Sequence, residues 1–539
     1  MNHLPSRGVL GARKLLNSLL ITGALLTHSA FGQVNSWTNP ASGNWEDPYW
    51  SLGVRPSSSQ SAIYLTNANW KAVQIGADTV LKYRGSLTIS NLYLGAPEGS
   101  SNTLLLNYSG LQTPLRVIEQ LRVGSNAALR MLSARLDANK KFLVDSTVYH
   151  EDDSQAFLDQ LIIGPASSAA YFLASGLVSS TTEEVGGTNY TQALFSQAGG
   201  TNRTSTLRVH ARARYQFAAG SLRTGDLFVG DVPTIFYPDS LAGIFTQSGG
   251  QLVVSNDLRV GDGGQGSGVF VMSGGSVSSD VLRIGTMNSG TGDFEQLDGT
   301  NQCRLLVLSE GDNNPWTLPD NYSYSRYFLG NGGLTTGQSQ LGAGRPCYFI
   351  QTGGVYEVTN ALNISDGQLD YSYYFLNGGT VRSGSMRIDS AQFYQTSGTN
   401  QVIGNLELYG NSLYQLGGGT LGTGGTFISE PGLYQHFRQS GGLHFATNFL
   451  QVGYSPTNRP TGDRYTLEGG QLTTPTIWLS GQFEHVGGLL TPPNLFMYGG
   501  KWIAGVPYSE FHQLDPRGGF ATISTIIIAT NSCILRFES

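Results

Sequence analysis

The side chains in this sequence that could perform acid–base chemistry form three small groups of acids. These groups are Glu151, Asp152 and Asp153; Glu183 and Glu184; and Asp366 and Asp370. Glycoside hydrolysis uses two carboxyl groups at a defined separation, and a lyase needs a base and a cation that neutralises the substrate. The first two groups lie in polar, loop-like segments, where solvated charge is the simpler interpretation, and the last pair flanks a glycine as turn residues do. The sequence alone therefore assigns no catalytic residue.

Histidines outside the N-terminal segment are scattered along the chain. They occupy His150, His210, His436, His444, His485 and His512. Two of them, His436 and His485, fall beside the aromatic position of a repeat described below, which would place them on one face. A lone histidine in a strand is more often packed or exposed than catalytic.

The segment Gly261–Gly268, GDGGQGSG, is similar to the Gly/Asp-rich calcium repeats of β-rolls. Those repeats bind because every turn supplies ligands to an ion shared with the next turn, and here the segment occurs once. A corner loop is therefore the expected structure. No P-loop, HExxH or GxSxG motif is present, and we expect neither a metal nor a cofactor.

The three cysteines, Cys303, Cys347 and Cys533, are far apart and show no CxxC spacing. They are expected to be buried apolar residues; a Cys303–Cys347 bridge between nearby repeats is the alternative. Glycine contributes 72 of 539 residues, about twice its usual share, while charged residues contribute only 13%. The net charge of −6 is mild and there is no basic stripe, so nucleic acid is not an expected partner.

A repeat organises most of the chain. One copy, FTQSGGQLVVSNDLRVG, covers Phe245–Gly261: an aromatic residue, a glycine pair, alternating apolar residues, a polar break and a second alternating run. Period-two alternation is typical of strands with one buried face, and Gly and Asn favour turns. Each copy is therefore predicted to be strand, turn, strand, turn, strand.

The spacing of the glycine pairs predicts the architecture. Twelve intervals span the 288 residues from Gly200 to Gly488, a mean of 24 residues, which fits one three-stranded coil of a parallel β-helix. Stacked coils should place like residues above one another and form an internal aromatic stack. The aromatic positions are Phe270, Phe294, Phe349, Phe375, Tyr394, Tyr414, Phe437, Tyr465 and Phe483. Longer intervals predict insertions at the corners of coils, the longest at Glu310–Tyr327.

The expected organisation has five parts. Residues 1–32 have the basic, apolar and small-residue regions of a signal peptide, with cleavage before Gln33. Residues 33–86 are rich in aromatic residues and should form an N-terminal cap, with a sugar-binding platform as the alternative. Residues 87–194 should form irregular first coils with insertions, and residues 195–500 the regular coils. Residues 501–539 contain an apolar run, Ile523–Ala529, suited to a buried strand, and end either as a truncated chain or docked on another surface.

The pattern SxWxNPASGNWxDPxWSxGxxP at Ser36–Pro56, followed by FxQxGGxLxVxNxLxVG coils, resembles a family of secreted proteins. These are the autotransporter-passenger-like and PEP-CTERM-associated β-helix repeat proteins of Verrucomicrobia-type bacteria. The resemblance implies export and an all-β, right-handed parallel β-helix. The printed sequence lacks the C-terminal Pro-Glu-Pro sorting motif of that family.

The expected function is that of an exported structural or adhesive rod at the cell surface or outside it, with glycans or other surface polymers as partners. The weakly charged, Ser/Thr/Asn-rich composition suits uncharged partners. The mature chain has no apolar segment long enough to span a bilayer. The alternative is a polysaccharide lyase or glycoside hydrolase, which would require acids, Arg and His along one face of consecutive coils.

Overall fold

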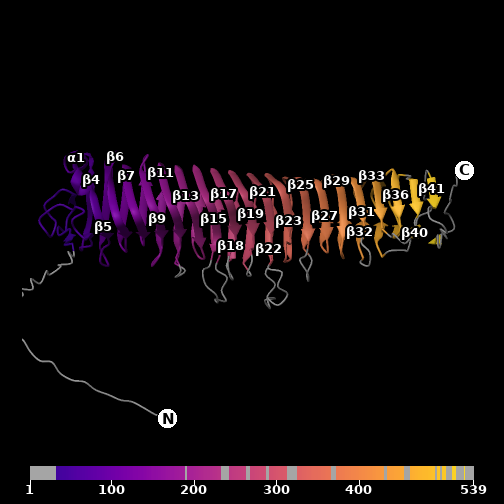
Figure 1. The fold of residues 1–539 in the computed structure, drawn as a ribbon, viewed down its shortest axis with the longest axis horizontal. Helices are drawn as coiled ribbons and strands as arrows, with labels where there is room; N and C mark the ends of the chain where they lie inside the picture. The colour runs from indigo at the N-terminus through magenta and orange to yellow at the C-terminus, as the bar shows by residue number, and fades with distance from the viewer. Residues whose placement is uncertain are drawn as a thin grey trace, which may run out of the picture.

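The computed structural model is a long rod of stacked β-coils (Figure 1). It describes residues 32–187, 191–231, 242–262, 267–286, 290–311, 324–365, 372–429, 434–454, 462–491, 494–497, 501–504, 513–516 and 527–528. The predicted signal peptide thus lies almost wholly outside the described residues. Every pairing between the named strands is parallel and joins one coil to the next, which confirms the parallel β-helix. No helix among the described residues is both long and apolar enough to cross a bilayer.

Two stacks of strands run along the rod, and each coil contributes to both. The short-strand stack contains β2 (Gly43–Asn44), β4 (Trp70–Gly76), the first parts of β6 (Ser101–Val123) and β7 (Ala127–Val144), β8 (Thr147–Glu151), β10 (Ala169–Leu173), β12 (Ala193–Gln197), β14 (Arg214–Phe217), β16 (Gly243–Gln247), β18 (Ser267–Met272), β20 (Thr291–Gln296), β22 (Ser325–Leu329), β24 (Cys347–Gln351), β26 (Tyr373–Leu376), β28 (Gln392–Gln395), β30 (Leu413–Leu416), β32 (His436–Gln439), β34 (Arg464–Leu467), β37 (Gln482–His485), β40 (Lys501–Ala504) and β42 (Ile527–Ile528).

The long-strand stack contains the remaining strands. They are β1 (Val34–Ser36), β3 (Ala62–Leu65), β5 (Thr88–Leu94), the second parts of β6 and β7, β9 (Gln155–Ile163), β11 (Leu177–Val185), β13 (Thr201–His210), β15 (Ser221–Asp231), β17 (Gln251–Val260), β19 (Ser276–Ile284), β21 (Thr300–Leu308), β23 (Gly333–Leu341), β25 (Val355–Ser365), β27 (Thr380–Asp389), β29 (Thr399–Tyr409), β31 (Thr420–Ile428), β33 (Leu443–Val452), β35 (Gln471–Thr473), β36 (Thr476–Leu479), β38 (Leu489–Leu490), β39 (Asn494–Met497) and β41 (Gln513–Pro516). The two predicted strands after each glycine pair are mostly one strand that bends at the polar break, as β17 does with exposed Ser255 and Asn256.

The turn from short to long strand has a constant length from β8 to β38. It has three residues, and from β10 onward the third is a glycine with positive φ. At Gly275 (φ 82°) an added Cβ would lie 2.6 Å from the Gly250 carbonyl oxygen of the coil below, so close stacking also requires glycine. The return connection varies instead, from residues 390–391 to residues 309–324. The variation in repeat length therefore lies at one corner.

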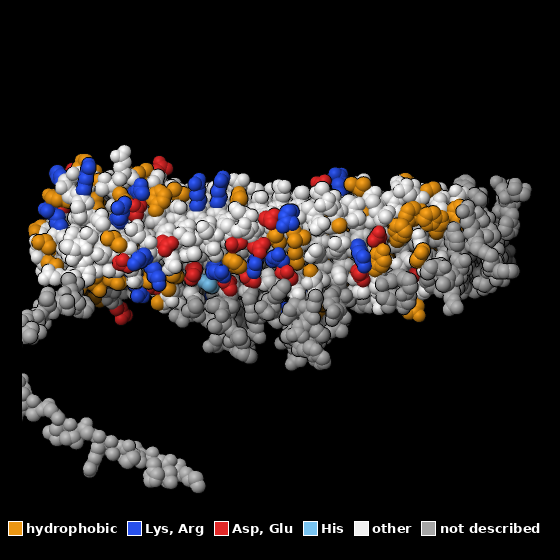
Figure 2. Space-filling model, in the orientation of Figure 1, with side chains coloured by type: hydrophobic (Ala, Val, Ile, Leu, Met, Phe, Trp, Pro, Cys, Tyr) orange, Lys and Arg blue, Asp and Glu red, His pale blue; other side chains and the backbone are white. Residues whose placement is uncertain are grey.

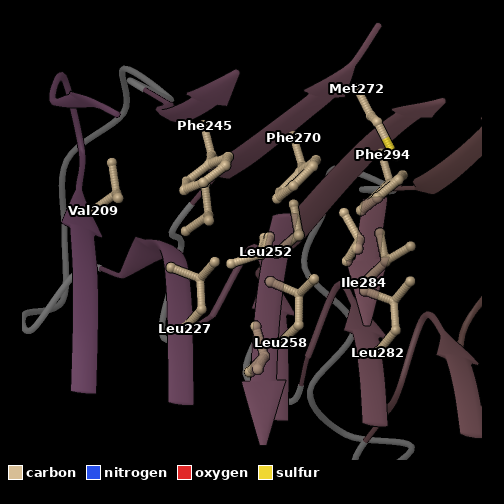
Figure 3. Packing of buried hydrophobic residues seen from close by; sticks show 14 of the residues in the cluster. Val209, Leu227, Phe245, Leu252, Leu258, Phe270, Met272, Leu282, Ile284 and Phe294 are labelled. Carbon is tan, nitrogen blue, oxygen red and sulfur yellow. The ribbon is translucent and has the colours of Figure 1, made fainter. Parts of the chain in front are cut away.

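The interior holds the predicted aromatic stack. The rings of Phe245, Phe270 and Phe294 stack at centroid distances of 4.7 and 4.6 Å, and Leu227, Leu258 and Leu282 form an aliphatic row (Figure 3). Two of the nine predicted positions are wrong. The inward residues of those coils are Tyr374 and Phe393, not Phe375 and Tyr394. Both coils have adjacent aromatics, and the inward one lies five residues before the positive-φ glycine, as in every other regular coil.

The strand stacks extend beyond the predicted regular coils at both ends. β1 to β4 pair in register with later strands, so the cap region already contains coils, followed by α1 (Ala77–Lys82) and a 3₁₀ turn (Arg84–Leu87). Trp37, Trp45 and Trp50 are buried in edge-to-face contacts and belong to the core, whereas Tyr49 and Trp70 of the same region are exposed. At the other end, β40, β41 and β42 continue the two stacks.

Candidate functional site

Strand β8 and its turn hold the first group of predicted acids. Glu151 ends the strand and pairs with Arg130 at 2.6 Å. Asp152 and Asp153 have positive φ and form the three-residue turn together with Ser154, which holds the position of the later glycine. Asp152 accepts a hydrogen bond from Tyr108 at 3.1 Å. The prediction of a loop was wrong for Glu151, because the segment is a regular coil whose turn uses Asp.

The two acids of the second group, Glu183 and Glu184, point to opposite faces of strand β11. Glu183 points into the core and is fully buried, and Asn202 Nδ2 donates to its two carboxyl oxygens at 2.9 and 3.2 Å. Burial raises the pKa of the Glu183 carboxyl to about 8. The loop prediction was wrong here too: the polar residues alternate as a strand. Glu183 could serve as a proton donor by its pKa, yet no substrate can reach it.

Glu184 faces outward and begins a row of charged groups that we call the charged strip. The strip consists of Glu184, Arg208, His210, Asp231, Asp257, Arg259, Asp262, Arg283 and Glu310. It follows the long-strand face from β11 to the end of β21, where Figure 2 shows acidic and basic side chains mixed along the rod. Phe228 lies within it, with the Arg208 guanidinium 4.1 Å from its ring centroid.

Each acid of the charged strip except Glu184 pairs with an arginine, and Glu184 lies beside His210. Asp257 contacts Arg259 at 2.8 Å and Arg283 at 3.6 Å, and Glu310 contacts Arg283 at 2.8 Å. Asp262 lies 3.6 Å from Arg259, and Arg208 pairs with Asp231. The His210 imidazole, 3.6 Å away, holds the pKa of Glu184 below its ordinary value. These groups neutralise one another, which suits a structural ladder better than acid–base catalysis.

The remaining histidines divide between core and surface. His150 Nε2 donates to the Ser154 backbone oxygen (2.7 Å), so Nδ1 of the neutral ring accepts from the Tyr171 hydroxyl (2.9 Å). Burial lowers the pKa of His150 to about 4. His444 is also buried, with a pKa lowered to about 3. The prediction that His436 and His485 share one face was wrong. The first points outward from β32 and the second inward from β37.

Several predicted residues carry no site that the structure describes. Asp366, Asp370, His512 and Cys533 lie outside the described residues. Cys303 and Cys347 are buried and free, so the alternative of a bridge was wrong. Within the glycine-rich segment, Asp262 accepts from Thr286 at 2.7 Å, and residues 263–266 are not described. The described residues contain no cluster of three potential metal ligands.

A groove crosses the outer face of the short-strand stack. Its volume is about 860 Å³, and its lining residues are Ser146, Thr147, Ser168, Ala169, Ala170, Gln192, Ala193, Leu194, Arg212, Arg214, Gln216, Ala242 and Ile244. One row of register partners forms its length: Thr147, Ala170, Leu194, Arg214 and Ile244. Four inter-strand steps of about 4.8 Å make this row roughly 19 Å long.

The groove is hollow because small side chains lie between larger ones. The small residues are Ala169 and Ala193, which begin β10 and β12, and Thr147 and Ala170, the first two residues of the row. The next two residues of the row, Leu194 and Arg214, are larger. Backbone groups at this corner are paired, as in Ala170 N to Ser146 O (2.7 Å). The hydroxyl and amide side chains of the lining are thus left to face solvent, and sequence reasoning missed them because they are far apart in the chain.

The outer short-strand face carries a second feature nearer the C-terminal end. Tyr348, Tyr373, Phe375 and Tyr394 stack on one another across successive coils, with centroid distances of 5.3 to 6.4 Å. Their ring planes lie within about 11° of parallel. The four rings therefore form one aromatic row along the outer face of these coils.

A comparison of the chain with known family models, curated proteins and solved structures gives no match. Function is therefore argued from the groove and the faces of the rod.

Proposed function

We propose that this protein is an exported structural or adhesive rod that contacts glycans or other surface polymers through its outer faces. The groove supports this proposal most directly. It is open, about 19 Å long at roughly 4.8 Å per strand step, and lined by hydroxyl, amide and guanidinium groups between Ala, Leu and Ile side chains. A few polar groups among apolar side chains are typical of ligand sites, and this mixture suits a sugar chain.

Export is the second part of the proposal. It is supported by the basic, apolar and small-residue regions of residues 1–32. N-terminal sequencing of the exported protein should find Gln33 first, and a mature protein that retains the apolar segment would contradict export by cleavage.

The alternative is a polysaccharide lyase or hydrolase, favoured by the acids, arginines and histidine that share the charged strip. Two observations weigh against it. The acids of the strip are already paired with arginines or, for Glu184, with His210, and the carboxyl with a raised pKa, Glu183, is buried inside the core. A general acid needs both a raised pKa and access to the glycosidic oxygen.

A glycan-array binding screen, with reducing-end release measured on the same panel, tests the proposal. We expect binding without release. Release of new reducing ends would replace the proposal with the enzymatic alternative, and the absence of binding across the panel would contradict glycan contact.

A further inference from the structure

We propose that the groove binds an acidic polysaccharide, with carboxylate groups of the polymer held by Arg212 and Arg214. This inference rests on the proposed function and specifies its ligand. It departs from the expectation of uncharged partners, which came from the composition of the whole chain and not from any one surface.

The first argument is the lack of countercharge. None of the described residues that line the groove is an acid, and neither Arg212 nor Arg214 forms an ion pair with a described residue. The arginines of the charged strip lie a few residues away in sequence and are all paired. Two unpaired guanidinium groups in one groove form a site for anions, and the planar guanidinium fits a carboxylate with two parallel hydrogen bonds.

The second argument is the backbone at Arg212. Its φ is +65°, a conformation that favours glycine, and the other non-glycine residues with positive φ are mostly Asn, Asp or Ser. An arginine at this position costs conformational energy. The Arg212 side chain forms no ion pair with a described residue that would offset this conformational cost. Folding therefore does not explain an arginine at this position, whereas a ligand held in the groove does.

The third argument is the rest of the lining. Ser146, Thr147, Ser168, Gln192 and Gln216 offer neutral donors and acceptors, and Leu194 and Ile244 offer apolar contact. Hydroxyl groups and C–H faces of sugar rings match these two kinds of surface. The groove thus combines charge for the carboxylates with neutral contacts for the sugar ring.

The experiment measures binding of the full chain to polygalacturonate and to its fully methyl-esterified form, which has the same backbone without charge. We expect the acid form to bind at least ten times more tightly, and added salt to weaken its binding. The double variant Arg212→Gln/Arg214→Gln should lose at least tenfold in affinity. The matched control, Arg203→Gln/Arg223→Gln, removes two exposed arginines from the long-strand face and should bind as the unaltered chain does.

A third variant separates binding from folding. Arg212→Gly supplies the residue that the positive φ favours, so it should melt at the same temperature or higher and still bind more weakly. Equal binding of both polymers, or equal affinity of the groove and control variants, would overturn the inference and leave the proposed function standing. Binding of neither polymer overturns the inference, and no binding on the wider glycan panel would overturn the proposed function as well.

Discussion

The charged strip and the groove lie on two faces of the same coils and use arginine in opposite ways. On β13 and β17 the long-strand face binds Arg208 to Asp231 and Arg259 to Asp257 and Asp262. Between β13 and β15 the chain also presents Arg212 and Arg214, which have no acidic partner among the described residues. Pairing therefore separates the charged strip from the groove. Arg203 and Arg223, elsewhere on the long-strand face, are exposed and form no ion pair with a described residue either, but they do not line the groove.

The interior follows the same principle with uncharged groups. One inward position alternates between polar and apolar residues in successive coils. The series runs His150, Leu173, Gln197, Phe217, Gln247, Met272, Gln296, Leu329, Gln351, Leu376, Gln395, Leu416, Gln439, Leu467 and His485. The Gln395 amide donates to Gly398 O of its own turn (3.2 Å) and to Thr420 O of the next coil (3.0 Å). One glutamine serves two coils, so the next coil has an apolar residue there.

A tyrosine in the following coil completes most of these networks. Tyr414 accepts from Asn400 (3.0 Å) and donates to Gln395 Oε1 (2.6 Å), and equivalent contacts join Tyr215 to Gln197, Tyr327 to Gln296 and Tyr465 to Gln439. The inward aromatic alternates between Phe and Tyr along most of the rod for this reason, and the alternation breaks at Phe245, Phe270 and Phe294. If pairing decides which polar groups the fold tolerates, changes that add or remove partners should have predictable signs.

The largest expected effect concerns Glu183, the buried carboxyl without a cation. Its folded pKa, about 8, lies above the ordinary 4.5, so the fold favours its neutral form. The stability that the neutral carboxyl contributes is fully present below pH 4.5 and is lost as the pH rises toward 8. This loss should lower the free energy of unfolding by about a few kcal/mol. Glu183→Gln should remove this dependence, as measured by urea unfolding at pH 5 and pH 9.

The matched control for Glu183 is its neighbour on the outer face. The pKa of Glu184 is held low by His210, so its contribution is present above its ordinary pKa and is lost on acidification. Glu184→Gln should therefore leave the alkaline loss of stability intact. Parallel pH profiles for the unaltered chain and Glu183→Gln would show that the buried carboxyl is not the cause.

The next effect is the loss of a partner inside the core. Tyr414→Phe leaves Gln395 Oε1 without its donor and Asn400 Nδ2 with only the weak acceptor Met386 Sδ, and it should lower the free energy of unfolding by about 1–3 kcal/mol. Tyr394→Phe removes a hydroxyl from the outer face of the adjacent coil and should change stability by less than about 0.5 kcal/mol. Equal effects in denaturant unfolding would contradict the pairing argument.

Much of the fold could be predicted because each coil repeats its local signals. The glycine turn, the bend at Asn256 and the alternation of Leu252 and Val254 lie within one repeat and indicate one coil. Phe375 and Tyr394 were misplaced because adjacent aromatics satisfy either phase of an alternating strand. The pairing of Glu183 with Asn202, and the groove itself, depend on residues that only stacking brings together, so inspection of single repeats could not find them.

The two outer faces should differ when one arginine is removed from each. Arg283→Gln deprives Glu310 of its partner and Asp257 of one of two, and since these groups are only partly buried the expected loss is about 1 kcal/mol. Arg214→Gln in the groove breaks no ion pair to a described residue and should change the melting temperature little. A groove variant as destabilised as the strip variant would remove the distinction between the two faces.

The smallest effect is a gain of stability where the interior lacks a partner. Gln247 Oε1 is buried without a hydrogen bond, because the next coil has Phe270 where other networks have tyrosine. Phe270→Tyr should supply the donor, as Tyr374 does for Gln351 at 2.7 Å, and raise the free energy of unfolding by about 0.5–1.5 kcal/mol.

The control is the same substitution one coil later, Phe294→Tyr, which places its hydroxyl toward the coil of Met272, where there is no amide. That variant should be less stable than the unaltered chain, by about 1–3 kcal/mol, because its hydroxyl is buried without a partner. Opposite shifts in the unfolding midpoints would show that pairing governs the core, whereas equal losses in both variants would show that packing volume does.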